Sequence, residues 1–139
     1  MGYFAGELVT SGVPVFTGLP ADSDKDGLKM LCAALASSGT VAMFHAVGCT
    51  PEAPTLEAAF GGKEPLQVIH YGPEEAARAR EELNKHNHEA VDIVVVGCPH
   101  CSLEEVAQAS RLLEGKKLLP GLEFWVEASM AVREMAERA

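Results

Sequence analysis

The chain has 139 residues, a formal net charge of −9 and 47% hydrophobic residues. This length is enough for one domain with its own core, and the acidic charge argues against binding to nucleic acid or to anionic membranes. No apolar run approaches the roughly 20 residues that a membrane span needs. The first residues lack the charged start and long apolar stretch of a signal peptide, so we expect a cytoplasmic protein with reduced cysteines.

Short apolar runs alternate with helical patterns along the chain. We interpret five runs as strands, the first of them the weakest: residues 13–18, 41–48, 66–72, 91–97 and 122–129. Capped or amphipathic stretches predict helices over residues 23–39, 55–62, 73–87, 102–115 and 129–139. This alternation predicts an α/β fold, namely a three-layer αβα sandwich with a mostly parallel sheet of four or five strands. We expect residues 1–139 to form a single domain.

Two of the predicted strands end in a Gly–Cys pair, at Gly48–Cys49 and at Gly97–Cys98. In open parallel sheets, ligands bind beyond the carboxyl ends of the strands. We therefore expect both cysteines at one edge of the sheet, close enough to reach a common ion. A helix that begins directly behind Cys98 would favour its thiolate, which is the form that binds metals and attacks disulfides.

Residues 98–101 read Cys-Pro-His-Cys, and their chemistry has several interpretations. A thioredoxin-like thiol–disulfide oxidoreductase uses such a motif, but normally after the first or second strand, whereas two strand–helix units precede it here. A structural zinc site needs four ligands, which Cys49, Cys98, His100 and Cys101 could supply only with poor geometry at His100. Three cysteines, Cys49, Cys98 and Cys101, match the thiolate ligands of an iron–sulfur cluster. A purely structural or assembly domain with free cysteines is the remaining alternative.

The chain resembles the catalytic, large-subunit portion of the aconitase X family. The resemblance lies in the segments GVPVFTGLP, DGLKMLCAALASSGTVAMFHAVGCTPEAPTLEAAF, VDIVVVGCPHCSLEEVAQASRLLEGKK and LEFWVEAS. It implies a hydro-lyase, or dehydratase, that eliminates water from a small hydroxy acid such as cis-3-hydroxy-L-proline or a phosphomevalonate. Because the family's large chain is far longer, we expect one domain of that enzyme, inactive by itself.

The same resemblance implies a cofactor, partners and site residues. The cofactor of the full enzyme is an iron–sulfur cluster or iron, of which we expect the isolated chain to be largely free. The implied partners are the remaining domains, a small subunit and a small-molecule substrate. The metal ligands are Cys49 and Cys98, and Cys101 is a third cofactor ligand or a neighbour of the site. His100, Ser102 and Glu52 are the candidate catalytic residues, and Thr50 and Ser129 the candidate substrate-binding residues.

The other reactive side chains have simpler interpretations. Cys32 lies on the predicted apolar face of the helix over 23–39, so we expect it in the core. We expect His45 and His70 to be buried and satisfied within strands, and His86 and His88 to be solvated. Apolar surface that neighbouring domains would cover is expected at residues 2–9, at residues 49–60 and around Trp125.

Overall fold

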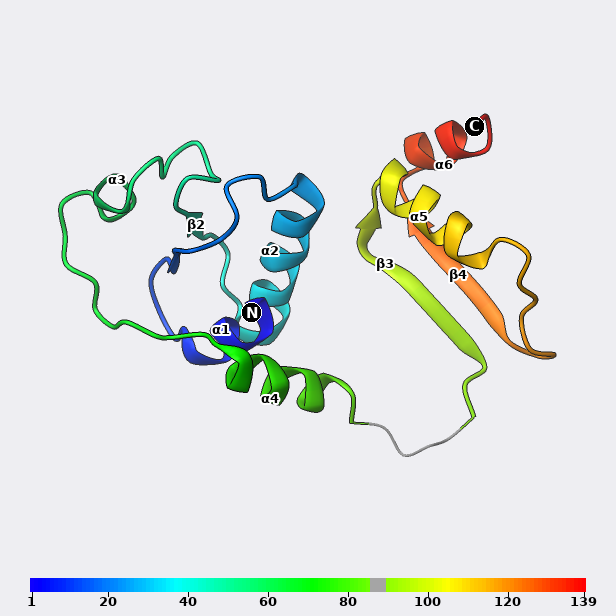
Figure 1. Cartoon of the computed structure of the whole chain (residues 1–139), viewed down its shortest axis with the longest axis horizontal. Coiled ribbons are helices and arrows are strands. Elements are labelled where there is room, and N and C mark those ends of the chain that lie inside the picture. The colour runs from blue at the N-terminus through cyan, green and yellow to red at the C-terminus, as the bar shows by residue number, and fades with distance from the viewer. Residues whose placement is uncertain (86–89) are drawn as a thin grey trace. The chain divides into compact units, whose positions relative to one another are not determined.

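The computed structural model describes residues 1–85 and 90–139, which separate into two compact units, Met1–Lys85 and His86–Ala139 (Figure 1). We describe each unit by itself. Whether residues 1–139 form a single domain depends on how the two units pack together, so the expectation of one domain stays a prediction. The predicted helix over 73–87 ends at Leu83. Residues 86 and 87 of that prediction lie outside the described residues, and so do the two histidines that we expect to be solvated, His86 and His88.

Unit 1 contains four helices and two very short strands. In chain order these are α1 (Gly2–Leu8), β1 (Val15–Phe16), α2 (Lys25–Gly39), β2 (His45–Ala46), α3 (Leu56–Phe60) and α4 (Pro73–Leu83). The start of α2 is fixed by Asp24, whose carboxylate accepts a hydrogen bond of 2.6 Å from the Gly27 amide. The helix ends at Thr40, which has a left-handed backbone conformation.

Helix α1, which the sequence pattern does not predict as a helix, packs closely against α2. Glycines allow this approach: Gly2 and Gly6 are buried in α1, and a Cβ atom on Gly2 would lie 2.8 Å from the Ala34 Cβ. Gly39 at the end of α2 faces the backbone of Gly6 in the same way. Leu35, at 1% exposure, is the largest fully buried side chain in the described part of the chain.

The β1 and β2 strands pair in parallel, with Val15 opposite His45 and Phe16 opposite Ala46. Both fall within the strands predicted over 13–18 and 41–48, but each has only two residues. The strand predicted over 66–72 is absent, since residues 66–71 are exposed and form no helix or strand. Apolar alternation alone cannot make a strand when no partner supplies its hydrogen bonds.

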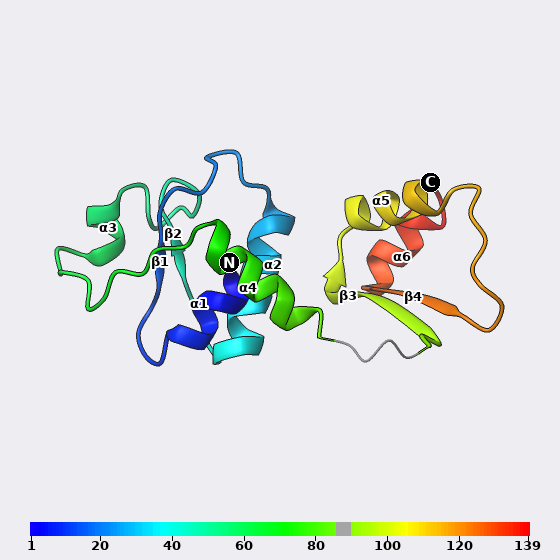
Figure 2. The ribbon, with the colours of Figure 1, turned by 60° about the horizontal axis from the view of Figure 1, so that its bottom comes forward.

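Unit 2 has a simple order of strand, helix, strand and helix: β3 (Ile93–Cys101), α5 (Leu103–Leu113), β4 (Glu123–Ala128) and α6 (Met130–Ala136). The two strands are parallel, with Val95 opposite Trp125 and, after a register shift, Cys101 opposite Ala128. The two helices lie on the same side of the strand pair (Figure 2). On the other side Ile93, Val95 and Trp125 are 44%, 48% and 49% exposed.

The predicted mixture of helices and parallel strands is confirmed, whereas the single sheet is not. The described residues form two sheets of two strands each, in place of one sheet of four or five strands. The prediction assumed a strand over 66–72, and that segment has no partner within the described residues. None of the described helices is both long and apolar enough to span a membrane.

Candidate functional site

The first group of candidate residues lies in a tight turn after β2. The turn is closed by backbone hydrogen bonds from Cys49 and Thr50 to the Ala46 carbonyl, at 3.0 and 2.9 Å, and from Gly48 to the Ala53 carbonyl, at 2.9 Å. Gly48 has φ +76°, a left-handed conformation that glycine adopts without strain. The turn therefore has a defined geometry although it follows a strand of two residues.

Within this turn the three candidate side chains differ in freedom. Thr50 is tied to β2, because its hydroxyl donates to the Ala46 carbonyl at 3.2 Å and accepts from the Ala46 amide at 3.1 Å. The Cys49 thiol is half-buried and donates to the Pro20 carbonyl at 3.3 Å. Glu52 is exposed. Cys49 and Glu52 can thus reach a ligand, while Thr50 mainly holds the turn.

The second group lies at the end of β3, where the strand approaches β4 very closely. Gly97 has φ +112°, and a Cβ atom there would overlap the Glu127 carbonyl and lie 2.9 Å from the Glu127 amide nitrogen. The peptide bond between Cys98 and Pro99 is cis. Cys98 itself is exposed. Glycine is required here because only a residue without a side chain fits against β4.

The Cys-Pro-His-Cys segment belongs to β3 and precedes the helix. Helix α5 begins at Leu103, and its N-cap is Ser102, so Cys98 does not lie at a helix start. The expectation that a helix begins directly behind Cys98 was therefore wrong. Cys98 is exposed and Cys101 is only 8% exposed, so the two thiols have different access to solvent and to ligands.

This arrangement also differs from that of a thioredoxin-like protein. Such an enzyme carries its two cysteines at the start of a helix, and a later antiparallel hairpin follows. In this chain the strand after Pro120 is β4, which pairs in parallel with β3 and leads into α6. Nothing in the described part of unit 2 thus favours dithiol exchange over the other interpretations.

Two serines mark the carboxyl edge of the β3–β4 pair. Ser102 forms the predicted capping box of α5: its hydroxyl accepts from the Glu105 amide at 3.2 Å, and its amide donates to the Glu105 carboxylate at 2.8 Å. Ser129 caps α6 by accepting from the Val132 amide at 3.3 Å. Because Cys101 pairs with Ala128, the residues that follow them, Ser102 and Ser129, are at the same edge. His100 lies on β3, two residues before Ser102, and is exposed.

Metal binding was tested against the positions of the donor atoms. The described residues contain no group of three or more His, Cys, Asp or Glu side chains that could hold a metal ion. Cys49 and Cys98 supply thiolates of the right chemistry, but they belong to different units, and their common edge stays a prediction. Among residues 1–85 and 90–139, neither unit has a complete ligand set of its own. Iron or a cluster would need ligands from both units or from elsewhere.

Three further expectations were wrong in detail. Cys32 is exposed on α2, while Leu28, Leu31 and Leu35 on the same predicted face are half-buried or buried. His70 is exposed instead of lying inside a strand. His45 was expected to have its hydrogen-bonding groups satisfied, but its buried Nδ1 atom has no hydrogen-bond partner among the described residues.

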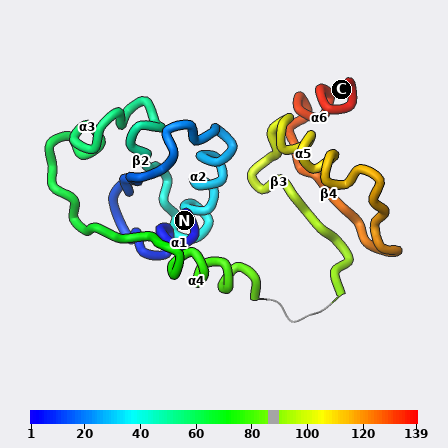
Figure 3. Tube along the Cα trace, in the orientation of Figure 1, coloured from blue at the N-terminus to red at the C-terminus, as the bar shows by residue number. Residues whose placement is uncertain are grey.

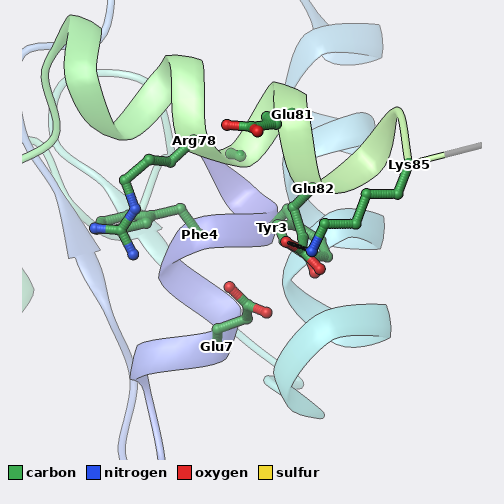
Figure 4. Close-up of a pocket in the computed structure, with 8 residues that line it drawn as sticks. Tyr3, Phe4, Glu7, Arg78, Glu81, Glu82 and Lys85 are labelled. Atoms are coloured by element: carbon green, nitrogen blue, oxygen red, sulfur yellow. Dashed lines mark hydrogen bonds and ion pairs between the residues drawn. The ribbon is translucent and has the colours of Figure 1, made fainter.

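An open cavity of about 460 Å³ lies between α1 and α4 in unit 1 (Figure 4). Its charged lining residues are Glu7, Arg78, Glu81, Glu82 and Lys85. A hydrogen bond to Glu7 raises the pKa of Tyr3, and pairing with Glu82 raises the pKa of Lys85. This cavity could not be predicted from the sequence, because α1 was not predicted as a helix. It contains none of the candidate site residues.

The comparisons with known proteins identify the family. The family model "Aconitase X second domain" matches residues 1–81, and "Aconitase X third domain" matches residues 91–139. The chain belongs to the aconitase X family.

Relatives and a solved structure match almost the whole chain. It is 38% identical over 140 residues to the cis-3-hydroxy-L-proline dehydratase of Pseudomonas aeruginosa, with coverage of 100% of this chain and 24% of that protein. It is 37% identical to the phosphomevalonate dehydratase large subunit of Methanocaldococcus jannaschii, covering 99% of this chain and 33% of that protein. The crystal structure of Thermococcus kodakaraensis aconitase X in its holo form matches with a TM-score of 0.84 and 31% identity, over 99% of this chain and 34% of that chain. The chain thus spans a quarter to a third of these proteins.

Proposed function

We propose that this chain is part of a hydro-lyase that removes water from a small hydroxy acid of the cis-3-hydroxy-L-proline or phosphomevalonate type. One observation carries the proposal: two dehydratases named for these substrates align with 99–100% of the chain, at 37–38% sequence identity. Since the chain spans at most a third of either protein, the isolated chain is inactive in this proposal. The rest of the active site comes from outside these 139 residues.

In this proposal the two Gly–Cys pairs, Gly48–Cys49 and Gly97–Cys98, supply metal ligands. Cys49 is half-buried and Cys98 is exposed, so each thiolate can reach a metal, whereas buried Cys101 is a neighbour. Iron or an iron–sulfur cluster, when bound, supplies a Lewis acid that makes the substrate hydroxyl a better leaving group. At least one further ligand comes from outside the described residues. The four free cysteines suit a reducing compartment such as the cytoplasm.

The remaining candidates handle protons and bind the substrate. Glu52 is exposed in the turn after β2, and His100 is exposed on β3. Either can accept a proton from the substrate. The Ser129 hydroxyl accepts from a backbone amide, and its own hydrogen can be donated to a substrate carboxylate or phosphate. Ser102 has the equivalent place on α5, and Thr50 holds the Cys49 turn in position.

The proposal also includes a partner subunit and further strands that extend the two short strand pairs. The name of the M. jannaschii relative, a large subunit, supports a small subunit as a partner in this case too. Strands from the rest of the enzyme would extend the two short pairs β1–β2 and β3–β4. A larger αβα sandwich would then form in the whole protein.

Two chimeric enzymes test the proposal. In one, this chain replaces the matching segment of the P. aeruginosa enzyme, which is then assayed with cis-3-hydroxy-L-proline. In the other, it replaces the matching segment of the M. jannaschii large subunit, which is assayed with its small subunit on the phosphomevalonate substrate. We expect dehydration by at least one chimera after anaerobic purification. If both chimeras fold and neither acts on its substrate, the proposal is wrong and an assembly role is favoured.

Cysteine variants of the active chimera test the ligand assignment. Cys98→Ser and Cys49→Ser should each lower the iron and sulfide content and the visible absorbance, along with the activity. Cys32→Ser is the matched control, because Cys32 is an exposed thiol on α2 that the proposal does not assign as a ligand. Full iron content in the Cys98→Ser variant would contradict the assignment of Cys98.

A further inference from the structure

The segment over residues 66–71 has the composition of a strand but no strand geometry. Its sequence, LQVIHY, is rich in β-branched and aromatic residues. Leu66 is 95% exposed and Val68 is 68% exposed, just before the start of α4 at Pro73. Large apolar side chains exposed to this degree so close together indicate a surface that is covered in the working protein.

The backbone of this segment is as open as its side chains. Among the described residues, no backbone hydrogen bond is formed by residues 64–71, whereas Lys63 donates to the Phe60 carbonyl and the Gly72 carbonyl accepts from Ala76 on either side. The tube in Figure 3 shows the chain running without coils from α3 to α4 around the outside of unit 1. Such a row of open amides and carbonyls is what an unpaired edge strand presents.

Both ends of the segment are held. At its start, Lys63 closes the turn after α3 by the hydrogen bond to Phe60. At its end, the Tyr71 ring packs against the Phe4 ring with a centroid distance of 5.6 Å, and the Gly72 amide donates to the Glu75 carboxylate at 2.8 Å. A segment fixed at both ends loses less conformational entropy when a second strand pairs with it.

We propose that residues 66–71 form a β-strand that pairs with a strand from the part of the enzyme outside these 139 residues. The proposal rests on the proposed function in one respect, namely that the chain works within a longer aconitase X protein. About two thirds or more of the polypeptide lies outside the matched segment in the relatives, which is long enough to supply a strand. A second copy of this chain is disfavoured as the partner, because each copy carries a net charge of −9.

Amide hydrogen exchange tests the pairing. In the isolated chain, the amides of residues 67–71 should exchange at the rates of an unstructured peptide. In the M. jannaschii chimera, a strand with one partner bonds only every second amide on that side. We therefore expect either Gln67, Ile69 and Tyr71, or Val68 and His70, to slow by at least about tenfold, and the alternate set to stay fast.

Proline variants give an independent readout. Val68→Pro and Ile69→Pro each remove one amide, and only one of the two amides is bonded in the proposed strand. Both variants should leave the urea midpoint of the isolated chain unchanged, and only one should lower that of the chimera. These measurements need folding but not dehydratase activity, so they can succeed where the proposed function fails. Free exchange of all these amides in a folded chimera, or protection in the isolated chain that grows with its concentration, would overturn the proposal.

Discussion

Replacing Gly39 by alanine should separate α1 from α2. An added Cβ atom would overlap the Gly6 carbonyl, and even the Gly6 Cα atom would lie at 2.8 Å, inside the 3.0 Å that Cβ contacts require. The obstacle is backbone, so no side-chain rotation relieves it, and α1 must move as a whole.

The size of the effect follows from two opposing terms. Overpacking of this kind costs about 3 kcal/mol at the upper end of its usual range, while alanine gains about 1 kcal/mol over glycine in a helix. We expect a net loss of about 2 kcal/mol in the free energy of unfolding of unit 1. With a urea dependence of about 1 kcal/mol per molar for a unit of this size, the midpoint should fall by about 2 M.

Urea unfolding followed by far-ultraviolet circular dichroism measures this change. Gly27→Ala is the matched control, because Gly27 is in the same helix and its Cβ atom would meet only the Asp24 carboxylate, at 3.1 Å. The fluorescence of Trp125, the single tryptophan, reports unit 2 separately. Equal midpoints for Gly39→Ala and Gly27→Ala would refute the packing argument.

Two further predictions concern other parts of the chain. Gly97→Ala should destabilise unit 2 by more than Gly115→Ala does, as measured by urea unfolding with Trp125 fluorescence. Both glycines have positive φ, but only Gly97 abuts the Glu127 backbone. Equal losses of stability would show that the close approach to β4 does not matter. Hydrogen bonds from its own amide and from the Gly72 amide lower the pKa of Glu75 below the ordinary value of a glutamate. Its carboxylate therefore stabilises unit 1 at pH values above that ordinary pKa and loses this contribution as the pH falls through the lowered pKa. Glu75→Gln should therefore flatten the acid limb of a pH titration of unit 1 stability, and an unchanged acid limb would contradict the assignment.

Helix positions were the part of the fold that sequence could predict, because their signals are local. Asp24 and Ser102 cap α2 and α5 through contacts within three residues, and such contacts depend little on the rest of the protein. Helix α1 was missed because its glycines are poor helix formers whose value lies in close packing against α2. The strand over 66–72 was overpredicted because a strand needs a partner that sequence periodicity does not reveal.

The sequence could suggest which residues form the candidate site, but not how these residues are arranged in space. The turn at Gly48–Cys49 exists as expected, whereas Gly97–Cys98 lies within β3, which continues to Cys101, and forms no strand-to-helix turn. The difference in burial between Cys98 and Cys101 could not be foreseen, because it depends on β3 continuing through the motif and pairing with β4. Whether Cys49 meets Cys98 depends on packing between units, for which a local pattern has no signal.

Each unit is one uninterrupted stretch of polypeptide, and each matches its own family model, over residues 1–81 and 91–139. The boundary between the units is crossed by the chain only once. A gene fission, fusion or duplication at that boundary would therefore leave every helix and strand of both units whole. It would nevertheless divide the two thiols, Cys49 going with one gene product and Cys98 with the other. If both thiols hold the metal, as proposed, the ability to bind it would thus be lost by a division that breaks none of the described helices and strands.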